Sequence, residues 1–311
     1  MKFKKPYFWD YKKISFFSFL LLPFTLLLFL KNILVKSNKN KNNNIKTICV
    51  GNIYVGGTGK TPFTISLAEM LNKLKYKTAI IKKYYPDQID EQKILNKKNS
   101  LYLGNKRIDS LNRAIKDKKK VAIFDDGLQQ RSLTYDITFV CFNTDNWIGN
   151  GLLLPAGPLR ERLSSLKNYD AVILSGNNKS TLNIKKKIKV INPNIEIFEA
   201  KYVPVSLKRT RLKEKYLIFS GIGNPKTFEK TLLINKFKII KSIVFPDHYQ
   251  YNDKNINRIK KLANTLNAKI LTTEKDYMRL NKNNKKKINF LKINLVINNK
   301  KKLIKFLKKR L

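Results

Sequence analysis

The sequence predicts an α/β protein with a parallel-sheet domain, a smaller C-terminal α/β lobe and an N-terminal helix that anchors the chain to a membrane. Three observations carry this prediction. Short apolar runs alternate with segments of helical periodicity from residue 46 onwards, which is typical of a parallel sheet covered on both faces. From about residue 206 the alternation continues as a second, smaller unit. Residues 14–30 form an uncharged apolar run.

The apolar run ISFFSFLLLPFTLLLFL is the candidate anchor. As a helix its 17 residues would cover about 25 Å, at the lower limit for crossing a bilayer. Lysines flank both ends, so the positive-inside rule gives no orientation, and a helix that dips into one leaflet fits as well as a span. We expect residues 1–36 to form a membrane anchor, followed by a polar linker at 37–44.

The remaining chain divides into a larger α/β domain at 37–205 and a smaller α/β lobe at 206–311. In the first, we expect strands at 46–50, 77–81, 121–124, 135–142 and 170–176, with a helix at 61–74. In the second, we expect strands at 216–220, 238–245 and within 268–276, and helices at 224–234 and 255–266. The tail 301–311 has helical spacing, either as a basic amphipathic helix or as a helix packed on its own domain.

The composition is extremely basic, with a formal net charge of +44. Lysine-rich solvated faces would account for this, and so would attraction to nucleic acid, an acidic membrane or a phosphorylated substrate. Charge alone does not choose among them. The two cysteines, Cys49 and Cys141, lie in separate apolar runs without a CxxC pair. This argues against a disulfide scaffold and against a structural zinc site.

The stretch VGNIYVGGTGKTP, residues 50–62, has the strand, glycine-rich turn and helix order of a phosphate-binding loop. Glycines allow close approach of backbone amides to phosphate, Lys60 would neutralise the β- and γ-phosphates, and Thr61 would hold Mg²⁺. Tyr54 stands where the pattern expects its first glycine. The expected ATP contacts are Tyr54, Val55, Gly56, Gly57, Thr58, Gly59, Lys60 and Thr61.

Two further motifs extend this interpretation. VAIFDDG, residues 121–127, is an apolar run ending in two carboxylates, so Asp125 or Asp126 would lie near the Mg²⁺. FPDHYQY, residues 245–251, holds the sole histidine, His248, which neighbouring Asp247 could orient. Composition and spacing alone thus indicate a membrane-attached P-loop nucleotide enzyme.

The motifs together resemble those of the tetraacyldisaccharide 4′-kinases of lipid A synthesis, along nearly the whole chain. The resemblance rests on FWDYKK before the apolar run, VGNIYVGGTGKTP, DDGLQQRSL, GNGLLLPAGPLRERLSSL, FSGIGNP, FPDHYQY and LTTEKDYMRL. It implies a P-loop NTPase-like domain with a smaller C-terminal lobe. It also implies transfer of the ATP γ-phosphate, with Mg²⁺, to the 4′-hydroxyl of tetraacyldisaccharide 1-phosphate, giving lipid IVA.

The resemblance also implies roles for particular residues. Asp90, in IDEQKIL, would be the base for the sugar hydroxyl, and His248 would pair with it. Lys60 and Thr61 would bind phosphate and Mg²⁺ with help from Asp125 and Asp126. Arg160 and Glu161, in PAGPLRE, would lie in a substrate-proximal loop. The sequence departs from the family in KKYY, where Lys83 replaces an arginine, and in DDGLQQ, where Gln130 replaces a histidine.

The expected partners are the lipid substrate and an anionic membrane surface, and we expect no nucleic-acid partner and predict no oligomeric state. The expected location is the inner (cytoplasmic) membrane, with the catalytic domain on its cytoplasmic face. The alternative is a membrane-associated P-loop ATPase of the partitioning type. Those proteins carry a lysine directly before the paired glycines, where this chain has Val55. A nucleic-acid-binding protein would leave the glycine loop and the DD strand unexplained.

Overall fold

The computed structural model describes residues 5–11, 13–34, 44–97, 99–130, 132–176, 180–205 and 214–311. The expected linker at 37–44 therefore lies outside the described residues, except for Asn44. The chain forms two compact units. The P-loop unit comprises Lys5–Tyr84, Lys98–Lys201 and Ile297–Leu311, and the C-terminal unit contains Tyr85–Lys97 and Tyr202–Val296.

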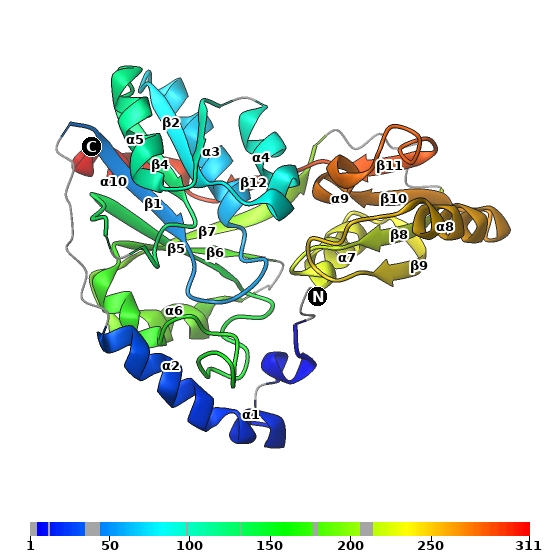
Figure 1. Cartoon of the computed structure of the whole chain (residues 1–311), viewed down its shortest axis with the longest axis horizontal. Coiled ribbons are helices and arrows are strands. Elements are labelled where there is room, and N and C mark those ends of the chain that lie inside the picture. Colours follow the sequence, from blue (N-terminus) through cyan, green and yellow to red (C-terminus); the bar gives the residue numbers. More distant parts are fainter. Residues whose placement is uncertain are drawn as a thin grey trace. The chain divides into compact units, whose positions relative to one another are not determined.

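The larger sheet has eight strands in the order β12-β7-β6-β5-β1-β4-β2-β3, shown in Figure 1. Strands β1 to β6 lie within the P-loop unit, and the unit boundaries fall within β7 and β12. Strands β1 to β7 pair in parallel throughout, as the alternation of strands and helices predicts. The strands are β1 (Lys46–Gly51), β2 (Thr78–Lys83), β3 (Leu101–Gly104), β4 (Val121–Asp125), β5 (Ile137–Asn143), β6 (Ala171–Ser175), β7 (Glu196–Pro204) and β12 (Ile293–Ile297).

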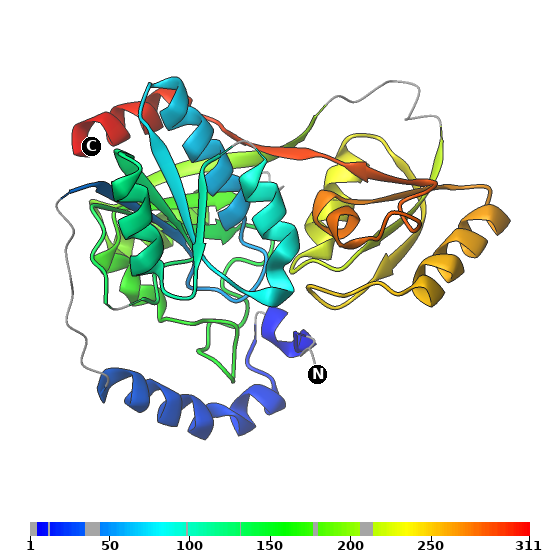
Figure 2. The same ribbon diagram turned by 45° about the horizontal axis from the view of Figure 1, so that its top comes forward.

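Helices cover both faces of this sheet because its central strands are apolar on both sides. Leu111 of α5 (Arg107–Lys116) packs on one face, and so does Ile188 of α6 (Leu182–Ile191). On the other face Phe139 of β5 contacts Phe63 of α3 (Lys60–Lys73) and Phe306 of α10 (Lys300–Arg310). Figure 2 shows α3 and α10 together on that side. The C-terminal tail is therefore a packed helix of the P-loop unit.

The C-terminal unit has its own four-stranded parallel sheet in the order β11-β10-β8-β9. Its strands are β8 (Lys215–Ser220), β9 (Lys238–Val244), β10 (Lys269–Thr273) and β11 (Ile288–Leu291). Its helices are α4 (Ile89–Asn96), α7 (Pro225–Ile234), α8 (Asp253–Thr265) and α9 (Glu274–Arg279), with a 3₁₀ turn at Pro86–Gln88. Asn252 caps α8 in a capping box.

The two units do not follow the sequence boundaries 37–205 and 206–311. The chain crosses near the expected point, between residues 201 and 202. However, α4 belongs to the C-terminal unit although it lies between β2 and β3 in sequence, and α10 returns to the P-loop unit. Ion pairs between α4 and α9, and aromatic contacts of α10, account for both assignments. Pairing across such sequence distances leaves no local signal.

The apolar N-terminal run forms two helices, α1 (Phe16–Leu20) and α2 (Leu22–Leu34), preceded by the 3₁₀ turn η1 (Tyr7–Asp10). Ser15 caps α1 by accepting a hydrogen bond from the backbone N–H of Ser18. In the described part of the chain, no helix has the length and hydrophobicity needed to span a membrane.

Candidate active site

The phosphate loop follows β1 and leads into α3. Gly56 and Gly59 adopt φ values of 115° and 86°, a region that residues with a Cβ rarely enter. Gly59 caps α3, so the helix begins at Lys60 with its unpaired amides and positive dipole end at the loop. The side chain of Asn52 braces the turn by donating to Thr58 Oγ1 at 2.9 Å. The local geometry is that of an anion-binding cradle.

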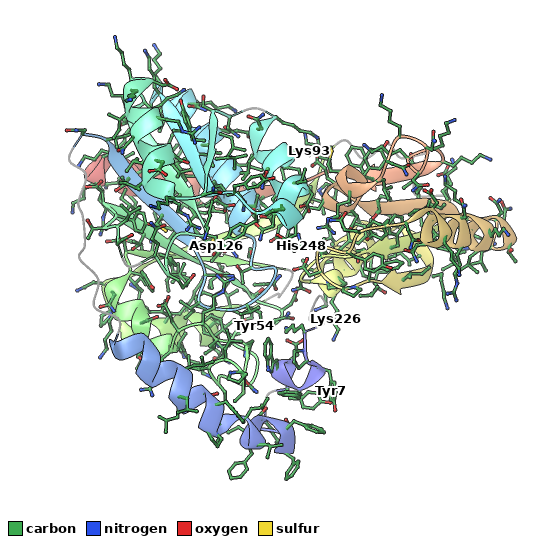
Figure 3. All side chains as sticks on the ribbon, in the orientation of Figure 1. Tyr7, Tyr54, Lys93, Asp126, Lys226 and His248 are labelled. Carbon is green, nitrogen blue, oxygen red and sulfur yellow. The ribbon has the colours of Figure 1, made fainter. Side chains whose placement is uncertain are left out.

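Tyr54 does not contribute its side chain to this cradle. Its ring is buried, and its hydroxyl donates to Oδ1 of Asp10 at 3.0 Å in η1. Lys5 also contacts the Tyr54 hydroxyl. Burial and the nearby Asp10 carboxylate raise the pKa of Tyr54, so it stays neutral. Tyr54, labelled in Figure 3, thus links the phosphate loop to the N-terminal segment.

Asp125 ends β4 beneath the phosphate loop and is fully buried. Its Oδ2 accepts a hydrogen bond from Thr61 at 3.4 Å, and its Oδ1 accepts one from Thr64 at 3.3 Å. The ammonium group of Lys82, on neighbouring β2, lies 2.8 Å from Oδ2. Lys82 is the first lysine of KKYY, so this motif places a buried cation against the candidate metal carboxylate.

The carboxylate of Asp126 forms ion pairs with two candidate phosphate-binding cations. Lys60 Nζ lies 3.7 Å from its Oδ1, and Arg160 Nη1 lies 3.1 Å from the same atom. Partial burial raises the pKa of Asp126, but Lys60 and Arg160 outweigh it and lower the pKa. Asp126 has a left-handed φ of 60° and carries the label in Figure 3. The Asp126 carboxylate thus occupies a position at which Lys60 and Arg160 can both bind an anion.

Neighbouring side chains hold this group in place. Glu161 accepts hydrogen bonds from Gln129 at 2.8 Å and from Tyr169 at 2.6 Å. Arg107 donates to the Asp126 carbonyl at 2.6 Å and to Gln130 at 3.1 Å. Gln130 is therefore a supporting residue for Asp126 through Arg107.

The oxygen donors at the loop suit Mg²⁺. Thr61 offers a hydroxyl and Asp125 a carboxylate, 3.4 Å apart, with Asp126 next in sequence. Magnesium takes few protein ligands and completes its shell with water and substrate phosphates. No group of three His, Cys, Asp or Glu side chains that could hold a metal occurs among the described residues. The donor set therefore fits a metal that arrives with a nucleotide.

The C-terminal unit brings Asp90 and His248 together. Oδ1 of Asp90 lies 3.8 Å from Nδ1 of His248, and its Oδ2 accepts hydrogen bonds from Nε and Nη2 of Arg279 at 3.0 and 2.6 Å. Burial raises the pKa of Asp90, but the His248 ring and the Arg279 guanidinium outweigh it and lower the pKa to about 2. Asp90 is therefore an anion across the physiological range.

Comparison with known proteins decides the family. A model of the tetraacyldisaccharide-1-P 4′-kinase family matches residues 16–101 and 89–311. The chain belongs to this family. It is 52% identical over 303 residues to a tetraacyldisaccharide 4′-kinase of Pelagibacter ubique, covering 97% of this chain and 96% of the relative. The Rickettsia typhi enzyme of the same name is 34% identical, with 96% of each chain covered.

A crystal structure shares the fold. The chain is similar to LpxK from Aquifex aeolicus, described as an "apo" form in complex with ATP, with a TM-score of 0.66 and 24% identity. The match covers 94% of this chain and 98% of the other. The expected α/β fold and the expected enzyme class, a tetraacyldisaccharide 4′-kinase, are confirmed, and the partitioning-type alternative is set aside.

Two residues of the site were not predicted from the sequence. In KKYY the buried contact is made by Lys82 and not by Lys83, because strand alternation and the β2–β4 register direct Lys82 towards Asp125. Arg279 lies in LTTEKDYMRL, which supplied only a resemblance. Its contact with Asp90 joins residues 189 positions apart. The alternation could have identified Lys82, but no sequence signal points to Arg279.

Proposed function

We propose that the chain binds ATP at residues 54–61 and transfers its γ-phosphate to the 4′-hydroxyl of tetraacyldisaccharide 1-phosphate, giving lipid IVA. The observation that carries the nucleotide site is the convergence of Lys60 and Arg160 on one carboxylate, Asp126. Phosphate oxygens offer these cations more acceptor sites than a carboxylate does. Tyr54 and Val55 would take part through their backbone.

Magnesium would be held by Thr61 and Asp125, with Asp126 near it. When bound, the ion neutralises charge on the β- and γ-phosphates. Lys60 would bind the same phosphates from the loop, and Arg160 would be released from Asp126 to reach the transferred group. Glu161 would fix the Arg160 loop through its bonds to Gln129 and Tyr169.

Asp90 would act as the general base. Its low pKa keeps the carboxylate ionised. Oδ1 of Asp90 would accept the proton of the 4′-hydroxyl while the hydroxyl oxygen attacks the γ-phosphorus and ADP leaves. His248 faces the same oxygen at 3.8 Å and would orient the carboxylate and stabilise its charge. Electrostatic positioning of this kind is the main catalytic device in phosphoryl transfer.

The N-terminal helices would attach the enzyme to an anionic membrane, with the catalytic units on the cytoplasmic face of the inner membrane. Support comes from α1, where four apolar side chains are more than half exposed: Phe16, Phe17, Phe19 and Leu20. Exposed aromatic and aliphatic side chains beside lysines favour a helix that lies in the membrane interface. The net charge of +44 would strengthen binding to anionic lipid and to the substrate's 1-phosphate.

A transfer assay tests the proposal. Purified protein in anionic vesicles, given γ-labelled ATP, Mg²⁺ and the disaccharide 1-phosphate, should form a labelled lipid with phosphate at the 4′-position. Lys60→Met should abolish labelling by weakening nucleotide binding. A folded wild-type protein that binds ATP but labels no lipid would rule out the proposed reaction.

A further inference from the structure

The guanidinium group of Arg279 joins Asp90 to the end of β8. Its Nε and Nη2 both donate to Oδ2 of Asp90, at 3.0 and 2.6 Å. Its Nη1 donates to the carbonyl of Gly221 at 2.6 Å and to Oδ1 of Asp276 at 2.9 Å. The Arg279 and Asp90 side chains are only 3% and 1% exposed. Solvent therefore screens this pair little.

The carbonyl of Gly221 bonds both Arg279 and the backbone of His248, the two residues that face Asp90. The Gly221 carbonyl accepts the Arg279 bond and also the backbone N–H of His248 at 3.1 Å, while the Gly221 N–H donates to Asp276 at 3.0 Å. A Cβ at Gly221 would lie 2.9 Å from the Tyr251 hydroxyl. The absence of a side chain at Gly221 thus leaves room for the Tyr251 hydroxyl, which donates to Oδ1 of Asp276 at 2.8 Å.

These contacts make the two oxygens of Asp90 unequal. Oδ2 is occupied by two guanidinium hydrogen bonds. Oδ1 receives no hydrogen bond from the described residues and faces His248 Nδ1 at 3.8 Å. A carboxylate fixed at one oxygen by a planar fork cannot rotate without breaking both bonds.

We propose that Arg279 is a positioning residue for phosphoryl transfer, which holds Asp90 so that Oδ1 receives the proton of the acceptor hydroxyl. This inference rests on the proposed role of Asp90 as base. Arg279 needs no contact with ATP or the lipid for this role, because it acts through the carboxylate. Lysine would supply the charge but not the fork.

Arg279 also affects when Asp90 is ionised. Besides Arg279, His248 of the 245–251 segment and Lys275 of α9 act on Asp90. The carboxylates that pair with these three cationic or titratable groups are Asp247 with His248, Glu91 with Lys275 and Asp276 with Arg279. Burial opposes the charged form of Asp90, and Arg279 counters that effect. Without the guanidinium, the pKa of Asp90 rises, so activity would begin to fall at a higher pH as the solution is acidified.

The same two helices provide a matched control. Lys97 and Glu274 form a 2.6 Å ion pair between α4 and α9, and neither contacts Asp90. Glu274→Gln thus weakens the attachment of α4 to α9 and leaves the Asp90 fork intact. A loss of kcat that comes from the Arg279–Asp90 contact must exceed the loss of kcat in Glu274→Gln.

The experiment measures kcat, KM for ATP and the pH profile of kcat/KM for wild type, Arg279→Lys, Arg279→Met, Glu274→Gln and Asp90→Asn. Arg279→Lys should lower kcat about ten-fold and keep the wild-type pH profile, and Arg279→Met should lower kcat about 100-fold and raise the pH of its acid limb. KM for ATP should stay within about two-fold of wild type in both, and Glu274→Gln should match wild type.

The positioning role would be overturned by a wild-type kcat in Arg279→Lys. It would also be overturned if Arg279→Met and Glu274→Gln lost kcat to the same extent. If Arg279→Met does not fold, Arg279→Lys decides, because it keeps a buried cation. An active Asp90→Asn would instead refute Asp90 as the base, whatever the Arg279 variants show. These outcomes thus distinguish a failure of Arg279 as the positioning residue from a failure of Asp90 as the base.

Discussion

The ammonium group of Lys82 lies 2.8 Å from Oδ2 of Asp125, and neither side chain is more than 3% exposed. Removing one partner of a buried ion pair leaves the other charge without compensation. Lys82→Met should therefore lower the free energy of unfolding of the nucleotide-free protein by about 3 kcal/mol, measured by urea denaturation.

Lys83→Met, at the next and less buried position of β2, is the matched control. It should change the free energy of unfolding by less than about 1 kcal/mol. Addition of Mg²⁺ and ATP should recover part of the stability lost in Lys82→Met, because the metal compensates the Asp125 charge. A Lys82→Met protein as stable as wild type would show that the pair contributes nothing.

Tyr54→Phe removes the hydroxyl that bonds Asp10 and leaves the loop backbone unchanged. Loss of this buried hydrogen bond should cost about 1 kcal/mol of stability and leave the Kd for ATP within about two-fold of wild type, measured by equilibrium binding. Tyr7→Phe, at an exposed ring, should change neither quantity. A ten-fold weaker Kd for ATP in Tyr54→Phe would mean that the hydroxyl itself serves the nucleotide.

The ionisation of Asp90 should make the free energy of unfolding depend on pH below about pH 4. Its folded-state pKa is about 2, below the ordinary 3.8, so its contribution is fully present above pH 3.8 and is lost as the pH falls towards 2. The difference in unfolding free energy between wild type and Asp90→Asn should shrink by about 2 kcal/mol from about pH 6 to about pH 2. Asp87→Asn, at an exposed carboxylate of the same segment, is the control for the substitution itself. A pH-independent difference for Asp90→Asn would contradict the lowered pKa.

Much of the fold could be predicted because its signals are local. The apolar strands, the glycine turn and the periodicity of α3 are each contained in a dozen residues, and the parallel sheet follows from their order. The assignment of α4 and α10 could not be predicted in this way. Both depend on pairings between distant residues, such as Glu91 with Lys275 and Phe139 with Phe306.

The site residues differ in the same way, because some lie in local motifs and others act only through tertiary contacts. Lys60, Thr61, Asp125 and Asp126 follow from local motifs, and the structure brings them together at the phosphate loop. Asp90 and His248 came from resemblance, and they do face each other. The bond of the Tyr54 side chain to Asp10 of the N-terminal segment is a tertiary contact that the loop pattern does not indicate. Arg279 acts on Asp90 through a tertiary contact that no motif encodes, whereas strand alternation within KKYY could have identified the Lys82 contact with Asp125.

The most direct test is single-turnover transfer from γ-labelled ATP to the disaccharide 1-phosphate by wild type, Asp90→Asn and His248→Ala. The account predicts that Asp90→Asn transfers phosphate about 10²- to 10⁴-fold more slowly, and His248→Ala about ten-fold more slowly, while the Kd for ATP stays within about two-fold in both. An Asp90→Asn enzyme that transfers phosphate at the wild-type rate would contradict it.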